Sequence, residues 1–190
     1  MSFSYGAEPR ISYLSELLQQ VYQGAIQIPR FQRTLVWDWS QQRELLCSIY
    51  EGLPIGSLLV WHTRLTNISA YQEIGPFTIS ESEKGIVNTY LMDGLQRLST
   101  LYGMALHPES TNHSPDKISR YVVYCDLKAE DVNDIFILES EISSEELESN
   151  KYQFMPLRYV FNGKELIKFQ RRIPECSEDW IDQSDKIAAV

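Results

Sequence analysis

One short segment, Met92-Asp-Gly-Leu-Gln-Arg-Leu98, holds side chains suited to binding a charged ligand. An apolar run predicts a strand over 87–92, and apolar spacing predicts a helix directly after Gly94. The first N–H groups of a helix lack intrahelical acceptors, and with the helix dipole they attract anions. Gly94 permits positive φ or close approach of a ligand, and Arg97 can present a two-pronged donor to phosphate. The segment therefore indicates a phosphate site, where Gln96 would hydrogen-bond an oxygen or a water and Asp93 would hold a metal ion.

A plain strand-to-helix turn is the alternative interpretation of the same segment. Asp93 would then cap the helix, and Arg97 would be a surface residue.

A cation is mildly unfavourable at the N-terminal end of a helix dipole, so folding would gain nothing from Arg97 there. We therefore expect Arg97→Ala to change stability by no more than about 0.5 kcal/mol, as other surface substitutions do.

A second segment, Ile28–Trp37, carries two arginines close to an aromatic ring. Pro29 favours an extended exit from a short strand. Arg30 and Arg33 flank Phe31 and Gln32, and such a group can hold a phosphate and stack a base. The alternative is a solvated loop in which Phe31 and Trp37 are anchored in the core.

Taken together, these segments resemble the DUF262 family. Its pattern is I-P-x-(F/Y)-Q-R-x-x-V-W, a helix, a P-I-G turn, and later D-G-Q-Q-R at the start of a helix. The matching pieces here are Ile28–Trp37, Pro54-Ile55-Gly56 and Asp93–Arg97, and the resemblance covers about residues 10–106. It implies a ParB/sulfiredoxin-like fold that binds or hydrolyses nucleoside triphosphates with Mg²⁺. Family members of the GmrSD type belong to modification-dependent restriction and phage-defence proteins, in which a C-terminal HNH-type nuclease domain cuts DNA.

Roles for particular residues follow from this resemblance. Arg33, Gln96 and Arg97 would contact phosphates, and Gln32 would orient a phosphate or a water. Asp93 would hold Mg²⁺ or activate water, beside Gly94 in the same motif. Pro54 and Gly56 would shape the wall of the pocket. The first Gln of the family motif is Leu95 here, so hydrolysis could be weakened while binding survives.

Two other functions compete with nucleotide binding. The same arginines could grip the phosphate backbone or a modified base of DNA in a non-enzymatic sensing module. The net charge of −9 disfavours a stand-alone DNA-binding domain. A direct nuclease is the third reading, but His62, His107 and His113 form no His-Asn-His or HExxH arrangement. We expect DNA to be contacted through another domain or subunit.

The elements that would position these residues predict an α+β fold, a small mixed sheet with flanking helices and a helical extension. Ser12 and Ser40 are expected to cap helices. Strands are expected over 25–28, 57–61, 121–125 and 134–138. Residues 63–85 are expected to form a turn-rich excursion with a hairpin. Helices are expected over 157–172 and 177–190. We place a nucleotide-binding core at 1–128 and an acidic loop with the extension at 129–190. That second part holds 7 basic and 14 acidic residues, a net charge of −7.

Composition places the chain among ordinary globular proteins, with 43% hydrophobic and 23% charged residues. No secretory signal or membrane span is predicted, so a cytoplasmic protein is expected. The helical pattern at the C-terminus has no cap, which suggests a piece of a longer protein. Cys47 and Cys125 are expected to be buried thiols, and the spacing of the three cysteines, with Cys176, predicts neither a disulfide framework nor a zinc site.

Overall fold

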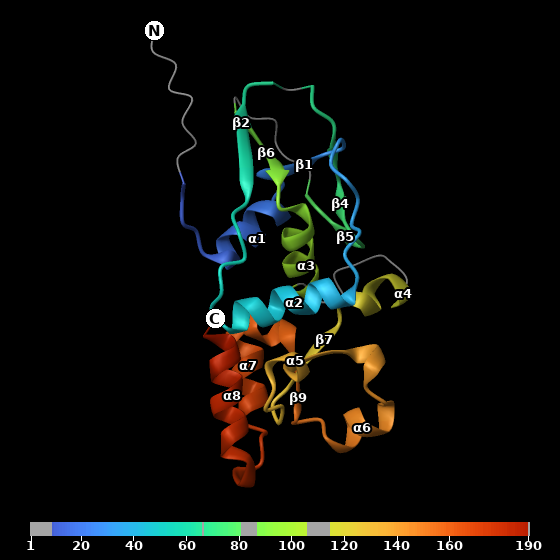
Figure 1. Cartoon of the computed structure of the whole chain (residues 1–190), viewed down its shortest axis with the longest axis vertical. Coiled ribbons are helices and arrows are strands. Elements are labelled where there is room, and N and C mark those ends of the chain that lie inside the picture. The colour runs from blue at the N-terminus through green and yellow to red at the C-terminus, as the bar shows by residue number, and fades with distance from the viewer. Residues whose placement is uncertain (1–8, 66, 81–86, 106–114, 190) are drawn as a thin grey trace.

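A computed structural model gives the structure of this chain, and it describes residues 9–65, 67–80, 87–105 and 115–189. Figure 1 shows an elongated molecule with its largest sheet in the upper half, a long helix across its middle, and a lower half that holds further helices and strands. The fold is α+β, as the sequence predicted. Among the described residues no helix is both long and apolar enough to cross a bilayer.

The upper sheet has the strand order β2-β6-β1-β3. Its members are β1 (Ile26–Pro29), β2 (Leu59–Thr63), β3 (Ala70–Tyr71) and β6 (Asn88–Asp93). Strand β1 runs parallel to β6, with Ile26 opposite Thr89, while β2 pairs with β6 in the antiparallel sense. The carboxyl ends of β1 and β6 therefore lie at the same edge of the sheet. Two strands of two residues each, β4 (Glu73–Ile74) and β5 (Phe77–Thr78), pair as a hairpin within the predicted turn-rich excursion.

Three helices accompany this sheet, α1 (Leu14–Tyr22), α2 (Trp39–Tyr50) and α3 (Leu95–Ala105). The predicted caps at Ser12 and Ser40 are wrong. Helix α1 follows Tyr13 without a side-chain cap bond. Helix α2 is capped by Asp38, whose side chain accepts from Gln41 N, while the Gln41 side chain accepts from Asp38 N. This reciprocal pair satisfies two backbone donors, which a lone serine two residues later cannot do.

The lower half contains a second sheet in the order β8-β7-β9. It is formed by β7 (Val123–Asp126), β8 (Phe136–Leu138) and β9 (Phe154–Pro156), so strands from beyond residue 128 flank a strand from before it. The predicted pairing of 121–125 with 134–138 is confirmed. The short helices of this half are α4 (Pro115–Ile118), η2 (Ser119–Tyr121), α5 (Val132–Ile135), η3 (Glu139–Glu141), α6 (Ser144–Ser149), η4 (Leu157–Phe161) and η5 (Glu175–Ser177).

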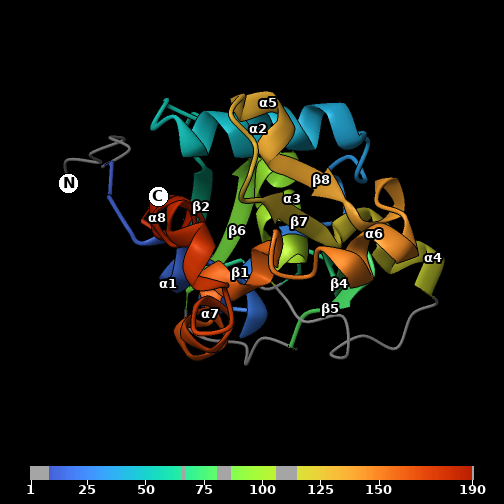
Figure 2. The ribbon, with the colours of Figure 1, turned by 90° about the horizontal axis from the view of Figure 1, so that it is seen from below.

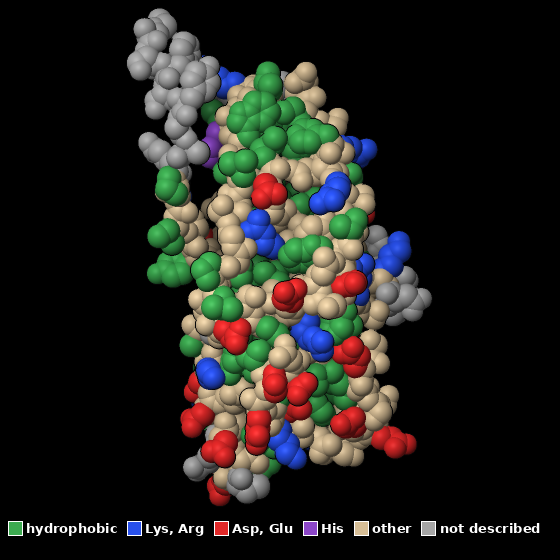
Figure 3. All heavy atoms as spheres, in the orientation of Figure 1, with side chains coloured by type: hydrophobic (Ala, Val, Ile, Leu, Met, Phe, Trp, Pro, Cys, Tyr) green, Lys and Arg blue, Asp and Glu red, His purple; other side chains and the backbone are tan. Residues whose placement is uncertain are grey.

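Two longer helices, α7 (Gly163–Gln170) and α8 (Glu178–Ala188), complete the predicted helical extension. They lie side by side in Figures 1 and 2, and Gln170 Nε2 donates to Ser184 Oγ between them at 2.8 Å. Apolar side chains of both sheets belong to one core cluster, which runs from Leu18 of α1 to Ile187 of α8. Figure 3 shows Asp and Glu side chains gathered over the lower half, where the sequence places the acidic excess.

Candidate functional site

The two motif segments meet at the shared edge of β1 and β6. They enclose a pocket of about 440 Å³, here called the motif pocket. Its lining residues are Phe31, Gln32, Arg33, Trp37, Met92, Asp93, Gly94, Leu95, Gln96 and Arg97. Arg33 and Arg97 thus line one pocket although 63 residues separate them in the chain, which is the convergence expected if both motifs build a single site.

The first turn of α3 forms one wall of the motif pocket. The first backbone hydrogen bond of this helix runs from Leu98 N to Gly94 O at 3.0 Å. The amides of residues 95–97 therefore have no acceptor within the helix, and all three residues line the pocket. Gly94 has φ +93°, and a Cβ there would collide with the Leu58 side chain. Only glycine fits this junction, so the strand turns directly into the helix.

Gln96 is engaged in holding the first motif in place. Its Oε1 accepts hydrogen bonds from Val36 N at 2.9 Å and Trp37 N at 3.2 Å, and its Nε2 donates to Thr34 O at 3.1 Å. Both ends of the amide are thereby used by the backbone of residues 34–37. Because of these bonds Gln96 is a positioning residue of the pocket in this structure.

Gln32 provides a reciprocal clamp from the first motif to the strand before the second. Its Nε2 donates to Leu91 O at 2.8 Å. Gln32 is partly buried and lines the motif pocket. Gln96 therefore joins the second motif to residues 34–37 of the first, and Gln32 joins the first motif to β6 just before the second.

Arg97 lies on the first turn of α3, as predicted, but its guanidinium is directed at the neighbouring loop. Nη1 donates to Ile55 O at 2.7 Å, and Nη2 donates to Ser57 O at 2.9 Å. A weaker contact joins Nη2 to the Asp93 carboxylate at 3.4 Å. The structure contradicts the premise that Arg97 is a surface residue without a structural role, because this side chain donates to two backbone carbonyls of the loop between α2 and β2.

Pro54 and Gly56 belong to the loop that Arg97 holds, and neither lines the motif pocket. Gly56 has φ +81°, and a Cβ there would lie 2.5 Å from Arg97 Nη1. Gly56 therefore affects the pocket indirectly, because its lack of a side chain leaves room for the Arg97 guanidinium. The family resemblance assigned Pro54 and Gly56 to the wall of the pocket, but neither is among the residues that line the motif pocket.

Arg33 remains available to a ligand. It is exposed, it lines the motif pocket, and it makes no hydrogen bond or ion pair with any residue that the structure describes. Phe31 beside it is 64% exposed, so the core anchoring considered for this ring is not observed. Trp37, by contrast, is partly buried and packs against the core cluster. An arginine without a partner among the described residues and an exposed aromatic residue thus line the same pocket.

Asp93 supplies a carboxylate to the pocket, with its side chain 74% exposed. Among the pocket's lining residues it is the only acidic one. No group of three or more His, Cys, Asp or Glu side chains able to hold a metal occurs within the described ranges. The donor set fits Mg²⁺ only when phosphate oxygens complete the coordination, which is how this ion is commonly held beside nucleotides.

Leu95, the departure from the family motif, is 8% exposed and belongs to the core cluster. It carries no polar atom with which to orient a water, so the pocket has an apolar floor at this position. Cys47 and Cys125 are buried, as predicted. Burial raises the pKa of both thiols, which keeps them protonated and unreactive. The side chain of Cys176 and the residues 107 and 113 lie outside the described residues.

Sequence reasoning missed a second cavity of about 530 Å³, here called the Ser99 cavity. It adjoins the motif pocket, because Arg33 and Leu95 line both. Its far side is built by the β3–β5 region and by η2, whose residues carried no motif. The only local signal was Ser99, a polar residue within an otherwise apolar helical face.

Comparison with known proteins identifies the family to which this chain belongs. The family model described as "GmrSD restriction endonuclease, N-terminal domain" matches residues 14–186. An uncharacterized protein of Methanocaldococcus jannaschii is 26% identical over 177 residues, which cover 82% of this chain and 30% of that protein. The chain thus spans less than a third of the relative that it matches. The family match includes both motif segments and both sheets, and the chain belongs to the family of GmrSD restriction endonuclease N-terminal domains.

Proposed function

We propose that this domain binds a nucleoside triphosphate in the motif pocket and serves as the regulatory module of a modification-dependent restriction nuclease. The observation that carries the proposal is the position of Arg33. Its guanidinium, unpaired among the described residues, lines the same pocket as the first amides of α3, which have no acceptor within the helix. A cation and backbone donors that line one pocket suit a polyanion, because the donors and the helix dipole favour negative charge.

The remaining groups divide between ligand binding and support. Arg33, the α3 amides and Gly94 would face the phosphates, and Asp93 would share a Mg²⁺ ion with them. When bound, Mg²⁺ neutralises phosphate charge. Gln32, Gln96 and Arg97 hold the segments that carry these groups. The Arg97 side chain is 19% exposed and lines the pocket, so its positive charge also acts on an anion there.

Binding is better supported than hydrolysis. Leu95 replaces the first glutamine of the family motif, and the remaining glutamine, Gln96, has both amide ends bonded to the backbone. Neither residue is poised to activate a water in this structure. We therefore propose a nucleotide-responsive module with slow or absent turnover, in which any DNA cleavage belongs to a nuclease domain or subunit outside this chain.

A second candidate function is recognition of DNA, and the exposure of Phe31 favours it. A ring that is 64% exposed next to an unpaired arginine can stack on a base while the arginine contacts a phosphate. The net charge of −9 opposes it, since backbone binding draws most of its strength from cationic side chains.

The two candidates are separated by titration of the purified protein with each nucleoside triphosphate and Mg²⁺, and in parallel with single- and double-stranded DNA. Nucleotide binding is expected with little phosphate release. Binding of DNA alone would replace the proposal with the second candidate. Rapid phosphate release would keep the site but overturn the expectation of slow turnover.

A further inference from the structure

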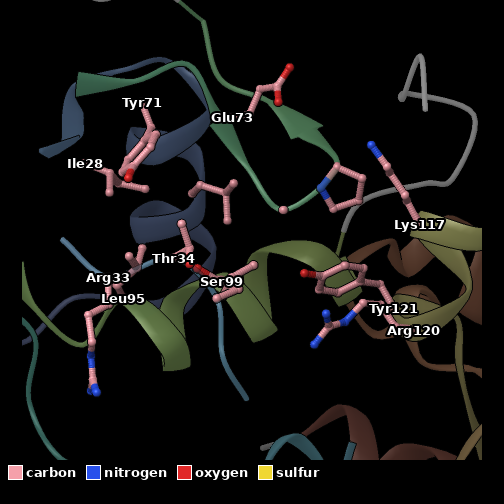
Figure 4. A pocket seen from close by; sticks show the side chains of 14 residues that line it. Ile28, Arg33, Thr34, Tyr71, Glu73, Leu95, Ser99, Lys117, Arg120 and Tyr121 are labelled. Carbon is pink, nitrogen blue, oxygen red and sulfur yellow. The ribbon is translucent and has the colours of Figure 1, made fainter. Parts of the chain in front are cut away.

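The Ser99 cavity has the size and lining of a site for a flat ring. Its volume of about 530 Å³ falls in the range of small-molecule pockets. Its walls are mostly apolar and include two tyrosines. Figure 4 shows Tyr71 and Tyr121 on opposite sides of Ser99, with the Tyr121 hydroxyl directed inward. The apolar side chains around them are Ile28, Leu35, Ile74 and Leu95.

Ser99 is a polar residue that lines this cavity, and its hydroxyl has no hydrogen-bond partner among the residues that the structure describes. The residue is 0% exposed, and Oγ forms no hydrogen bond within the described part of the chain. The next residue, Thr100, is equally buried, but its Oγ1 donates to Gln96 O at 3.0 Å. A hydroxyl on this helix can therefore satisfy itself against the preceding turn. Ser99 does not, although a buried unpaired hydroxyl costs stability.

The position of the cavity relates it to the motif pocket. Arg33 and Leu95 line both spaces, so the two pockets lie next to each other. In Figure 4 the Arg33 guanidinium points away from Ser99 and out of the cavity. A ligand with an anionic part near Arg33 and a flat, hydrogen-bonding part near Ser99 would match both ends.

We propose that the Ser99 cavity holds the nucleobase of the nucleotide whose phosphates occupy the motif pocket. This inference rests on the proposed function. A nucleobase has two apolar faces for the tyrosine and aliphatic walls, and its edge carries donors and acceptors for a hydroxyl that can act as either. Ser99 is then a specificity residue, since a buried hydroxyl without its partner penalises any ring that offers none.

The test compares nucleoside triphosphates with inorganic tripolyphosphate, each with Mg²⁺, on the parent protein and on Ser99→Ala. The parent should bind its preferred nucleotide more tightly than tripolyphosphate. Ser99→Ala should weaken that nucleotide about tenfold, leave tripolyphosphate affinity unchanged, and melt at the same or a higher temperature, since an unpaired hydroxyl has been removed. Ser99→Leu, which places a larger apolar side chain in the cavity, should reduce nucleotide affinity towards the tripolyphosphate level.

Ser184 provides a matched control, because it is also a serine with 0% exposure. Its Oγ donates to Ile181 O at 2.8 Å and accepts from Gln170 Nε2. Ser184→Ala should therefore melt at a lower temperature than the parent and bind nucleotide normally once folded. This reverses the pattern expected for Ser99→Ala, and a general effect of removing a buried hydroxyl would not produce the reversal.

Three outcomes would overturn the inference, and they are distinguishable. If neither nucleotide nor tripolyphosphate binds the parent, the proposed function fails as well. If both bind equally, the phosphate site stands and the base has no site of its own. If Phe31→Ala lowers nucleotide affinity to the tripolyphosphate level while Ser99→Ala binds like the parent, the base stacks on Phe31 outside the cavity.

Discussion

A Cβ atom at Gly56 would lie 2.5 Å from Nη1 of Arg97, so the loop before β2 can close on α3 only because residue 56 has no side chain. The guanidinium occupies the space and bonds the carbonyls on either side of it, at Ile55 and Ser57. The P-I-G turn and the arginine of the second motif are therefore one structural unit. This relationship changes what substitutions at either residue should do.

Arg97→Ala should destabilise the protein by about 1.5–3 kcal/mol, the usual contribution of hydrogen bonds to a charged group. Two loop carbonyls lose their donor, and the guanidinium side chain is only 19% exposed. Urea unfolding measures the change. A variant as stable as the parent would show that the loop is held by other contacts. Arg97→Lys should recover only part of the loss. Its ammonium group can still donate to one carbonyl, but it lacks the fixed fork with which arginine reaches two.

Gly56→Ala should also be destabilising, for two separable reasons. The residue has φ +81°, which disfavours any L side chain, and the new methyl group would collide with Arg97. The same substitution made in the Arg97→Ala protein retains only the first cost. A double-mutant cycle by thermal or urea unfolding should therefore give less than additive destabilisation. Additivity would contradict the close approach of the two residues.

Gln96→Ala should loosen the first motif while leaving the helix intact. The backbone amides of Val36 and Trp37 lose their shared acceptor, and Thr34 O loses its donor. These two amides should then exchange with solvent faster than in the parent, as measured by hydrogen exchange. Gln96→Glu keeps the acceptor and should preserve their protection better than alanine does. Unchanged exchange in both variants would mean that the clamp contributes nothing to order.

The elements of the fold were largely predictable, but their caps were not. Apolar spacing located α1, α2 and α3 because each buries apolar side chains in the core. Ser40 and Asp38 are both good capping residues, and choosing between them requires the residue three positions on. Gln41 completes a capping box with Asp38, whereas Ser40 has Arg43 at that position.

The members of the motif pocket were predictable from the motifs, and most of their partners were not. Convergence depends on the parallel pairing of β1 with β6, which no local pattern specifies. Gln96 and Arg97 bond to backbone carbonyls and amides, and every residue carries these groups, so the sequence does not mark which ones they reach. The Ser99 cavity was missed because its outer wall comes from a turn-rich segment without periodicity.

Tyr102 should make stability fall at high pH. Burial raises the pKa of this phenol to about 12, from an ordinary value of 10.0. Below pH 10 the phenol is protonated in both states and its contribution is complete. As pH rises from 10 towards 12 the unfolded chain releases this proton first, so the unfolded state gains relative stability. Urea unfolding of the parent at about pH 9 and about pH 11 should show this loss.

Tyr102→Phe removes the titrating group and should flatten the loss over that interval. Tyr13→Phe, at a side chain that is 78% exposed, serves as the matched control and should follow the parent. Identical pH dependence in the parent and in Tyr102→Phe would show that other groups cause the loss. The Tyr102 hydroxyl also donates to Thr78 O at 3.4 Å, a long bond, so the phenylalanine variant should remain folded at neutral pH.

Arg33 offers the sharpest test of the proposed function, because a neighbouring arginine supplies its control. Arg33 lines both pockets without a partner among the described residues. Arg30 lies three residues earlier and lines neither. Its Nε donates to Ala70 O at 3.2 Å, and its guanidinium lies 5.9 Å from the centre of the Tyr71 ring. The two side chains carry the same charge in one short loop and differ only in what they face.

Arg33→Ala should weaken nucleotide and tripolyphosphate binding about tenfold or more, since a charge-assisted hydrogen bond contributes about 1.5–3 kcal/mol. Its melting temperature should match the parent's, because Arg33 forms no hydrogen bond or ion pair with the described residues. Arg30→Ala should bind like the parent and melt slightly lower. Equal losses of affinity in the two variants would indicate a general effect of the charge of this loop. Normal binding by Arg33→Ala would show that the phosphates do not bind in the motif pocket. Calorimetric titrations and melts of the three proteins at one salt concentration decide among these results, because screening alters exposed charge interactions in all of them alike.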